Sequence, residues 1–372
     1  MRVALDARAL AAPVRSGVER YVVDLTRAVA QLEQRPEIIA YVDRPVRDAE
    51  LSRALANRIV VKVVRARRGW LRAALPWRLW RDRVDLVHLP STILPPFLPC
   101  PAVVTVHDLA WRRFPETYAA DDLAMQTVAG FRSVARAAHV IAVSQTTARD
   151  LTELLQVPNE KITVTPLGVS PSFTADGPPL SAEAFAGAER LAQGYVLYMG
   201  GLLPRKNLMR LLDAYERVRR EMDTPPLVLP GGDSLHAGEL AERARELGLE
   251  EQVIFPGYVE EGQLPALYRG ATVFVYPSLY EGLGLAVLEA MASGAPVITS
   301  DRSGTAEVAG EAALLVDPEN VAEIASALSG LLGDVALRDD LAARGLVRSR
   351  SYRWDVTAQE TVAVYQRVAR SA

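Results

Sequence analysis

The stretch SLYEGLGLAVLEAMASGAPVITS, residues 278–300, decides the fold of this chain of 372 residues. It follows the apolar run ATVFVYP, residues 271–277, which is typical of a buried strand. A loop with Gly282 and Gly284 comes next, and apolar residues at helical spacing then predict a helix over residues 285–293. A glycine ends that helix, and the apolar run PVITS predicts a second buried strand. Together these segments predict one strand–helix–strand unit of a parallel α/β sheet.

The loop at the start of this predicted helix is suited to ligand binding. The backbone amides and the dipole of a helix N-terminus attract anions such as phosphate. Two carboxylates, Glu281 and Glu289, flank the loop. Because a carboxylate beside a phosphate would repel it, both are better explained as acceptors for hydroxyl groups, and hydroxyls with phosphate indicate a sugar nucleotide. From spacing alone, an ordinary surface loop with two solvated glutamates explains the pattern equally well.

Strand-like and helix-like segments alternate along the whole chain in two series. Seven apolar, Val- and Ile-rich runs lie between residues 3 and 169, and six more lie between residues 195 and 317. Many are apolar on both faces, as buried parallel strands are. The alternation predicts two doubly wound, Rossmann-like α/β domains.

The domain boundaries follow from changes in composition. Residues 174–193 are rich in Gly, Pro and small side chains and predict an interdomain linker. The first domain is therefore expected over residues 1–175 and the second over residues 194–353. Residues 354–372 predict a final amphipathic helix.

Composition and charge limit the class of protein. A hydrophobic fraction of 49% with 23% charged residues fits a soluble globular protein, and no run of about 18 apolar residues occurs. Residues 1–175 hold 24 Lys and Arg against 17 Asp and Glu, whereas the whole chain holds 42 against 45. The basic first half is expected to meet an anionic partner. The single cysteine excludes an internal disulfide and favours a cytoplasmic location.

A second motif, GGLLPRKN, follows the first predicted strand of the second domain. Gly201 and its neighbour allow a ligand to approach the backbone closely. Arg205 and Lys206 place two cations near the start of the next helix, where a diphosphate is the natural partner. A solvated basic pair in a turn would be the favoured interpretation of this motif alone, but the Glu281 loop in the same domain favours the diphosphate.

Two further candidates lie in the first domain. SGVER places Gly17 between the first strand and the first helix, which is a weak signal alone. TVHDLAW places His107 at the carboxyl end of an apolar strand, where open α/β sheets position ligand groups. Neither an Asp-x-Asp pair nor a Cys/His cluster is found, so no metal site is expected.

Residues 62–83 are strongly basic and contain three tryptophans. Basic residues interleaved with Trp and Leu are typical of a segment that lies on an anionic membrane. A basic helix whose tryptophans pack on the core explains the pattern equally well. Nucleic acid is not expected as a partner, because no known nucleic-acid-binding module accompanies the charge.

The sequence EGLGLAVLE resembles the E-x7-E signature of family 4 glycosyltransferases, retaining enzymes with the GT-B fold. GGLLPRKN and the SGVER loop resemble further elements of that family, although Leu283 and Ala286 stand where Phe and Pro are usual. The resemblance implies that Glu281 holds the sugar, Glu289 the ribose, and His107 the transferred sugar. It also implies a donor-binding group made of Gly17, Gly201, Arg205, Lys206, Gly282, Leu283, Gly284 and Leu285. The final helix is then expected to cross back onto the first domain.

Residues 16–25 and 307–318 look most like bacterial mannosyltransferases of polysaccharide synthesis. This implies retaining, metal-independent transfer of a hexose, namely mannose from GDP-mannose, to a glycan or lipid-linked acceptor at the inner face of the plasma membrane. No cofactor is expected, because the sugar nucleotide is the substrate. The alternatives are a UDP-sugar-dependent transferase, a sugar-nucleotide epimerase, or a non-catalytic subunit that binds nucleotide. A phosphorylase is disfavoured, because it would need a pyridoxal-phosphate lysine and lysine is scarce in this chain. A dehydrogenase is disfavoured as well, because no G-x-G-x-x-G follows the first predicted strand.

Overall fold

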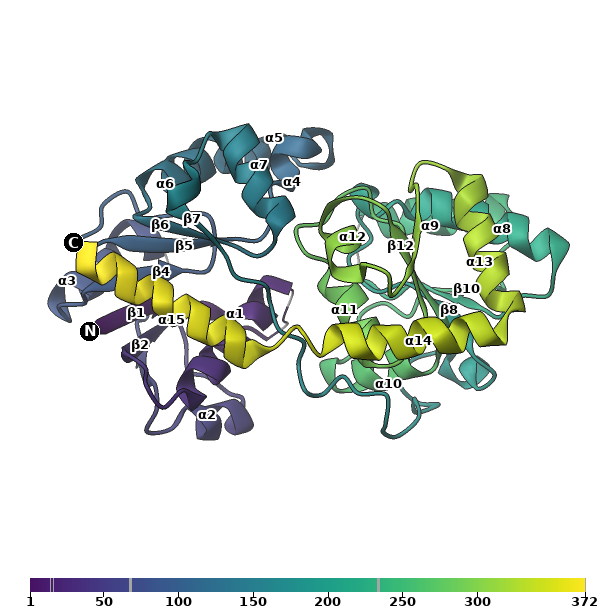
Figure 1. Ribbon diagram of the computed structural model, residues 1–372, viewed down its shortest axis with the longest axis horizontal. Helices are drawn as coiled ribbons and strands as arrows, with labels where there is room; N and C mark the ends of the chain where they lie inside the picture. Colours follow the sequence, from purple (N-terminus) through teal and green to yellow (C-terminus); the bar gives the residue numbers. More distant parts are fainter. Residues whose placement is uncertain (14, 16, 67–68, 233–234, 372) are drawn as a thin grey trace. The chain divides into compact units, whose positions relative to one another are not determined.

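The computed structural model describes residues 1–13, 15, 17–66, 69–232 and 235–371 and divides into two units (Figure 1). Met1–Gly168 and Arg353–Ala372 form the first unit, and Val169–Tyr352 form the second. The stretch expected to be a linker thus belongs to the second unit. It is held there by the Arg269 guanidinium, which donates hydrogen bonds to the carbonyl oxygens of Thr174 and Pro178 at 3.1 and 2.8 Å.

The first unit is built on a seven-stranded parallel sheet with the strand order β3-β2-β1-β4-β5-β6-β7. The strands are β1 (Arg2–Asp6), β2 (Glu37–Val42), β3 (Val60–Val63), β4 (Leu86–Leu89), β5 (Ala102–Val106), β6 (His139–Ala142) and β7 (Ile162–Val164). The strand order reverses direction between β1 and β4, so this is the point where ligands bind in open α/β sheets.

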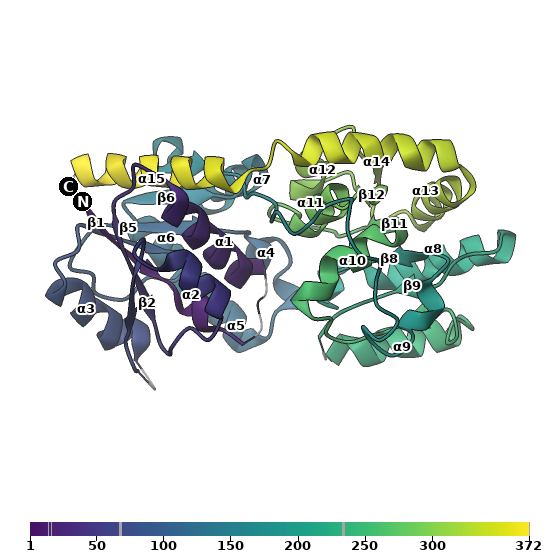
Figure 2. The same cartoon turned by 90° about the horizontal axis from the view of Figure 1, so that it is seen from below.

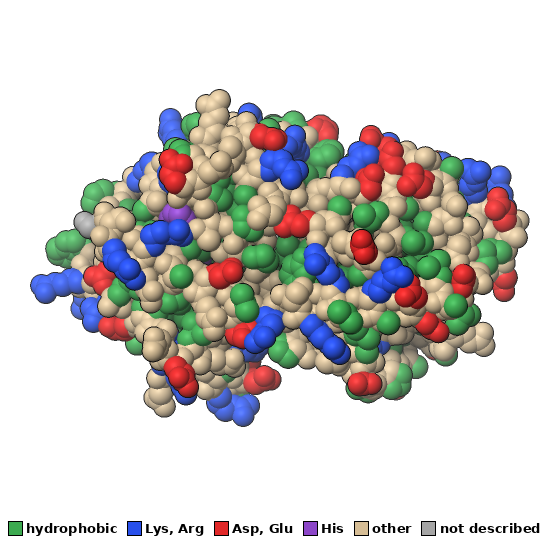
Figure 3. Space-filling model, viewed as in Figure 1, with side chains coloured by type: hydrophobic (Ala, Val, Ile, Leu, Met, Phe, Trp, Pro, Cys, Tyr) green, Lys and Arg blue, Asp and Glu red, His purple; other side chains and the backbone are tan. Residues whose placement is uncertain are grey.

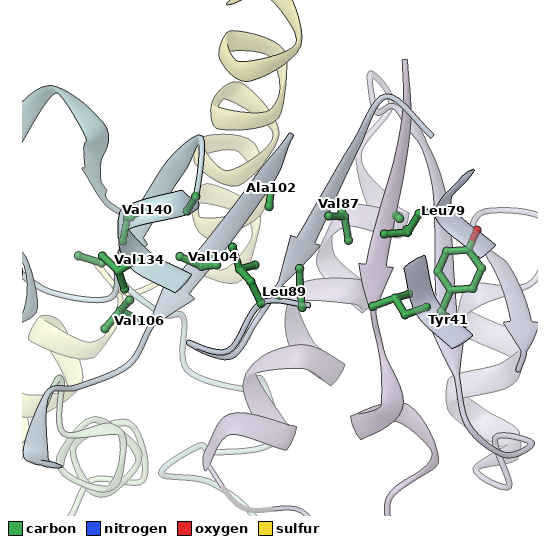
Figure 4. Close-up of a cluster of buried hydrophobic side chains, with 14 of the residues drawn as sticks. Tyr41, Leu79, Val87, Leu89, Ala102, Val104, Val106, Val134 and Val140 are labelled. Atoms are coloured by element: carbon green, nitrogen blue, oxygen red, sulfur yellow. The ribbon is translucent and has the colours of Figure 1, made fainter. Parts of the chain in front are cut away.

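Buried aliphatic side chains from neighbouring strands and from the helices on the sheet form the core of the first unit (Figure 4). The helices are α1 (Gly17–Gln31), α2 (Ala49–Leu55), α3 (Leu75–Arg81), α4 (Ala110–Arg113), α5 (Ala120–Met125), α6 (Phe131–Arg136), α7 (Gln145–Leu155) and α15 (Trp354–Ser371). A π-helical turn at Gln126–Gly130 joins α5 directly to α6. Ser144 caps α7 by accepting a hydrogen bond from the Thr147 amide at 2.9 Å.

Helix α15 packs on the first unit, beside α1 and against β4 and β6 (Figures 1 and 2). Its buried face includes Ala358, Val362 and Tyr365. The start of α15 lies so close to the chain after β7 that a Cβ on Gly168 would be 2.3 Å from the backbone nitrogen of Trp354. Glycine is therefore required at that position for the helix to dock.

The second unit contains a six-stranded parallel sheet with the order β10-β9-β8-β11-β12-β13. The strands are β8 (Tyr195–Leu197), β9 (Leu227–Val228), β10 (Val253–Ile254), β11 (Ala271–Tyr276), β12 (Val297–Ser300) and β13 (Leu314–Val316). The helices are α8 (Leu208–Glu221), α9 (Leu235–Glu246), α10 (Leu264–Arg269), α11 (Leu285–Ala292), α12 (Ser303–Ala309), α13 (Val321–Gly333) and α14 (Val335–Ser349). The predicted pair of doubly wound domains is confirmed, with strands shorter than the apolar runs that marked them.

On the face shown in Figure 3, basic side chains are interspersed with acidic and apolar ones over both units. On this face the basic residues of the first half therefore do not form one continuous patch. In the part of the chain that the structure describes, no helix is both long and apolar enough to cross a membrane.

Candidate active site

The two loops singled out in the second unit lie at the switch point of its sheet. Residues 200–207 follow β8, and residues 277–284 follow β11, which is the neighbour of β8. The strand order reverses direction between these two strands, so both loops start from adjacent carboxyl ends. The sheet topology thus brings together two motifs that are separated by about 75 residues in the sequence.

The loop before α11 is held tightly against the start of α12. The Gly304 amide donates a hydrogen bond to the Glu281 carbonyl oxygen at 2.9 Å, and the Glu281 amide donates to Ser303 Oγ at 3.1 Å. A Cβ on Gly304 would lie 2.2 Å from the Gly282 carbonyl oxygen. Gly284 has φ +101°, and a Cβ there would lie 3.0 Å from Thr305. Glycine at these positions therefore fixes the path of the backbone as it enters α11.

Arg205 and Lys206 converge on the carboxylate of Glu281. Lys206 Nζ donates hydrogen bonds to Glu281 Oε1 and, at 2.7 Å, to Tyr276 Oη. Arg205 Nη1 donates to the same Glu281 oxygen at 3.1 Å and to the Tyr280 carbonyl oxygen at 3.0 Å. Lys206 and Glu281 are buried, at 6% and 8% exposure. The three charged groups therefore form one cluster, in which Lys206 and Glu281 are buried and Arg205 is half-buried.

Opposing effects act on the pKa of Glu281. Burial raises it, but the positive charges of Lys206 and Arg205 outweigh burial and lower the pKa from 4.5 to about 2. Glu281 is therefore ionised at neutral pH. It can accept hydrogen bonds from cations or hydroxyls but cannot donate a proton.

Two tyrosines at strand ends connect this cluster to Gly201. Tyr276, the last residue of β11, lies under Lys206 with Nζ 5.0 Å from the ring centroid. Tyr198 follows β8 and stacks on Tyr276 with the ring centroids 5.5 Å apart. Its hydroxyl donates to the Gly201 carbonyl oxygen at 2.8 Å. Neither tyrosine was predicted as a site residue from the sequence, although each lies at the end of an apolar run at the carboxyl edge of the sheet.

Glu289 lies in the second turn of α11 and is 1% exposed. Its Oε2 accepts a hydrogen bond from Tyr268 Oη at 3.0 Å. Leu283 is buried, whereas Leu285 at the start of α11 is half-buried. The two glutamates of the motif thus have different surroundings, because Glu281 contacts cations and Glu289 contacts a neutral hydroxyl.

In the first unit, His107 directly follows β5. Its Nε2 lies 3.1 Å from the Pro90 carbonyl oxygen, which can only accept, so Nε2 carries the proton. Burial lowers the pKa of His107, and the neutral ring then has a lone pair on Nδ1 that can accept a hydrogen bond. Gly17 is the exposed first residue of α1. Ser16 beside it lies outside the described residues.

A cavity of about 350 Å³ opens at the same edge of the first unit. Its lining combines acidic and basic side chains with the residue whose carbonyl holds His107: Asp6, Arg8, Glu19, Asp43, Arg44 and Pro90. Asp6 is fixed by two hydrogen bonds from Arg8, at 2.9 and 2.8 Å. The rest of the lining is largely apolar and includes Ala9, Val18 and Val22. A mostly apolar cavity with a few charged side chains is typical of a small-molecule site.

The basic, Trp-containing stretch is divided between core and surface. Trp70 is buried and its indole Nε1 donates to Asp6 Oδ2 at 3.3 Å. Trp77 and Trp80 are 49% and 68% exposed, and the guanidinium groups of Arg78 and Arg81 lie over the Trp77 ring. Arg67 and Arg68, part of the same prediction, lie outside the described residues. Among the residues described, no group of three metal-binding side chains occurs.

Two family models match the chain: Glycosyltransferase Family 4 over residues 15–173 and Glycosyl transferases group 1 over residues 182–347. The O-antigen chain mannosyltransferase B of Escherichia coli is 32% identical over 292 residues, which cover 78% of this chain and 76% of that protein. The D-inositol 3-phosphate glycosyltransferase of Nocardia farcinica (strain IFM 10152) is 32% identical over 308 residues, 80% of this chain and 64% of that protein.

Among solved structures, sucrose-phosphate synthase from Thermosynechococcus elongatus superposes with a TM-score of 0.78 at 21% identity, covering 100% of both chains. At this identity the likeness concerns the fold. The E. coli relative carries the family assignment, because it is similar over most of both proteins. The chain therefore belongs to the family 4 glycosyltransferases and has the GT-B fold.

Proposed function

We propose that this glycosyltransferase transfers mannose from GDP-mannose to a growing glycan on a lipid carrier, with retention of the anomeric configuration. The observation that carries the proposal is the convergence of Arg205 and Lys206 on Glu281 beside the N-terminus of α11. Support for mannose comes from the name and the similarity of the E. coli relative, which is an O-antigen chain mannosyltransferase.

The charged cluster suggests how the donor would be held. The donor diphosphate would bind to Arg205, Lys206 and the amides of residues 282–285, where positive charge stabilises the departing nucleoside diphosphate. When the diphosphate occupies the two cations, the Glu281 carboxylate would accept a hydrogen bond from a hydroxyl of the sugar instead. Gly201 and Gly17 would allow close approach of the backbone to the donor, and Glu289 would accept from the ribose hydroxyls.

The reaction itself exchanges one bond for another at the anomeric carbon. The bond to the leaving phosphate oxygen breaks, and a bond to the acceptor oxygen forms on the same face of the ring. The acceptor proton passes to the leaving phosphate. In this scheme His107 accepts a hydrogen bond from the sugar through Nδ1 and does not act as a nucleophile. Neither a metal nor a cofactor takes part, so transfer is expected to persist in excess EDTA.

A donor screen tests this proposal. Thermal shift with GDP, UDP and ADP is expected to show the largest stabilisation with GDP. Incubation with GDP-mannose and a mannosyl acceptor on a lipid should then give an α-linked product, which the anomeric coupling in its NMR spectrum identifies. A larger shift with UDP and transfer from a UDP-sugar would replace the donor assignment. Conversion of the sugar nucleotide without an acceptor would indicate an epimerase, and binding without turnover a non-catalytic subunit.

A second acceptor class is favoured by a separate observation. The Nocardia farcinica relative is named for transfer to D-inositol 3-phosphate and is as similar in identity as the E. coli protein. An inositol phosphate is small and anionic, and the cavity lined by Pro90 contains Arg8 and Arg44, which pair with Asp6 and Asp43 when no ligand is bound. Competition between an inositol phosphate and the lipid-linked glycan in the same assay would distinguish the two acceptors.

We also propose that Trp77 and Trp80 contact an anionic membrane at its cytoplasmic face, with Arg78 and Arg81 beside them. Replacing both tryptophans by Ala should reduce sedimentation with vesicles that contain anionic phospholipid, and salt should weaken the binding of the wild type. Tyr258→Ala is a matched control, since Tyr258 is a 55% exposed aromatic residue of the second unit. Equal sedimentation of all three proteins would assign the tryptophans no role at the membrane.

A further inference from the structure

A chain of hydrogen bonds runs through the buried interior of the first unit. His88 on β4 is 0% exposed, and hydroxyl groups contact both of its ring nitrogens. Nδ1 lies 2.6 Å from Tyr365 Oη on α15, and Nε2 lies 2.8 Å from Thr105 Oγ1 on β5. Thr105 Oγ1 is in turn 2.9 Å from Tyr21 Oη on α1. Four side chains from two strands and two helices are therefore connected, and none is more than 2% exposed.

Packing alone does not explain why these four buried positions carry polar side chains. A buried polar group that loses its partner destabilises a protein by about 1–3 kcal/mol, whereas an apolar side chain of the same shape carries no such risk. Burial also lowers the pKa of His88 to about 3, so the ring is neutral at physiological pH. What a fully bonded neutral network provides is a fixed orientation of its members.

The network ends at the candidate active site. His88 is two residues before Pro90, whose carbonyl oxygen holds His107 Nε2, and Thr105 is two residues before His107 itself. Tyr21 packs edge-on against the His107 ring, with the centroids 4.8 Å apart and the planes at 79°. The partly exposed ring of His107 is thus contacted by Tyr21, a member of the network, and by the carbonyl of Pro90, two residues after another member.

Helix α15 contacts this network at two places, although it is the last element of the chain. Tyr365 bonds to His88, and Trp354 at the start of the helix lies 6.1 Å from the Tyr21 ring. In Figure 2, α15 runs along the first unit next to α1, the helix that carries Tyr21. The docked helix α15 therefore contacts the network at both of its ends, His88 and Tyr21.

We propose that Tyr365, His88, Thr105 and Tyr21 form a positioning network that sets the orientation of His107, so that His107 is aligned only when α15 is docked. This inference rests on the proposed function insofar as His107 contacts the transferred sugar. None of the four residues touches the substrate in this scheme.

The first experiment reads His107 directly and does not depend on activity. The chain contains four histidines, so long-range ¹H–¹⁵N spectra of the full-length protein can be assigned by substitution. Tyr365→Phe removes only the hydroxyl that bonds His88. It is expected to shift the ring signals of His107 as well as those of His88, although Tyr365 does not bond to His107. Thr361→Val is the matched control, because Thr361 is a buried hydroxyl on the same helix outside the network.

The second experiment measures transfer with the donor that the screen identifies. Tyr365→Phe and Tyr21→Phe are each expected to lower kcat by about tenfold, because small misplacements of a positioning group are costly to rate. The KM for the donor should stay within about twofold, since Arg205 and Lys206, the cations proposed to hold the diphosphate, belong to the other unit. Thr361→Val should match the wild type. If no donor supports transfer, the proposed function fails, while the spectra still decide the network.

Two results would overturn the inference. One is a Tyr365→Phe spectrum in which His107 is unchanged, as in Thr361→Val. The other is a shifted His107 signal with unchanged kcat, which would show that the network orders the ring without serving transfer. If Tyr365→Phe does not fold, Tyr21→Phe tests the opposite end of the same network by both measurements.

Discussion

Each unit buries a polar cluster near the carboxyl edge of its sheet, and the two clusters differ in charge. In the second unit, Glu281 is ionised between Arg205 and Lys206. In the first unit, His88 is neutral between the hydroxyls of Tyr365 and Thr105. The pKa is lowered in both cases, but an acid with a lowered pKa stays charged while a base with a lowered pKa stays neutral. The unit with the buried charge is thus the one that is expected to neutralise a diphosphate, and the unit with the neutral network is the one that is expected to orient a sugar.

The largest effect is expected from Glu281→Gln, which removes the charge from the ionised cluster and keeps its shape. We expect kcat to fall by about 10²–10³, because a charge-assisted hydrogen bond to the sugar is lost in the transition state. Nucleoside diphosphate affinity, measured by calorimetry, should stay equal or increase, since Arg205 and Lys206 no longer share a carboxylate. Full activity of the variant would show that the cluster does not act on the sugar. Unfolding curves of Glu281→Gln, with Glu281→Asp as control, distinguish a loss of kcat in the folded enzyme from a loss of stability.

Arg205→Ala tests the cationic side of the same cluster. Nucleoside diphosphate binding should weaken by about 2–4 kcal/mol, the effect of removing one partner of a buried charge pair. Arg210→Ala, a nearby arginine on α8, is the matched control and should bind as the wild type does. An unchanged affinity of Arg205→Ala in calorimetry would remove this side chain from the donor site.

The two clusters should respond to acid in different pH ranges. The folded-state pKa of His88 is lowered from 6.5 to about 3, so its protonation favours the unfolded state and stability falls as pH drops below 6.5. Over pH 6.5 to 4.5 this amounts to about 2–3 kcal/mol. The contribution of Glu281, whose pKa is lowered from 4.5 to about 2, is fully present above 4.5 and is lost only between those values.

Hydrogen exchange as a function of pH measures this difference. Peptides from β4 and β5 should lose protection between pH 6.5 and 4.5, while those from β11 and β12 keep theirs. His88→Gln should reduce the pH dependence in the first unit, and the remainder is expected from His107 and His139, whose pKa values are also lowered by burial. His236→Asn is the control, because His236 lies on α9 of the second unit. Equal loss of protection in both units over this range would contradict the assigned charge states.

The smallest effect separates the two glutamates of the E-x7-E motif. Glu289 accepts a hydrogen bond from Tyr268, so Glu289→Gln should weaken nucleoside diphosphate binding by about 1–2 kcal/mol and leave kcat at saturating donor nearly unchanged. Tyr268→Phe, which removes only the hydroxyl, should have a smaller effect in the same calorimetric titration. If Glu289→Gln loses turnover while Glu281→Gln loses affinity, the two roles are reversed.

Several features of the site were predictable because they depend on local sequence. The strand, loop and helix around Glu281 follow from apolar periodicity and from glycine, and α11 begins at Leu285 as predicted. The ion pairs of Glu281 were not predictable. From the sequence, Glu281 was expected to accept hydrogen bonds from sugar hydroxyls, and in the structure its carboxylate pairs with Arg205 and Lys206. Without a bound diphosphate, the carboxylate of Glu281 supplies the negative charge beside the two cations.

The boundary between the units was also not predictable from composition. Residues 174–193 have the composition of a linker, but Arg269 and Gly294 of the second unit pack against them. Composition indicates that a segment lacks regular structure, and it does not indicate whether side chains elsewhere hold that segment.

The sequence by itself determined the two α/β domains, the glycine-containing loops and the residues that carry charge, because periodicity and residue type act over a few positions. Only the tertiary structure decided which of these residues meet. It brought residues 205 and 281 together at adjacent strand ends, and it placed Tyr365 from the last helix against His88. Such contacts depend on strand order and helix docking, and these are set by the packing of the whole chain and not by local patterns.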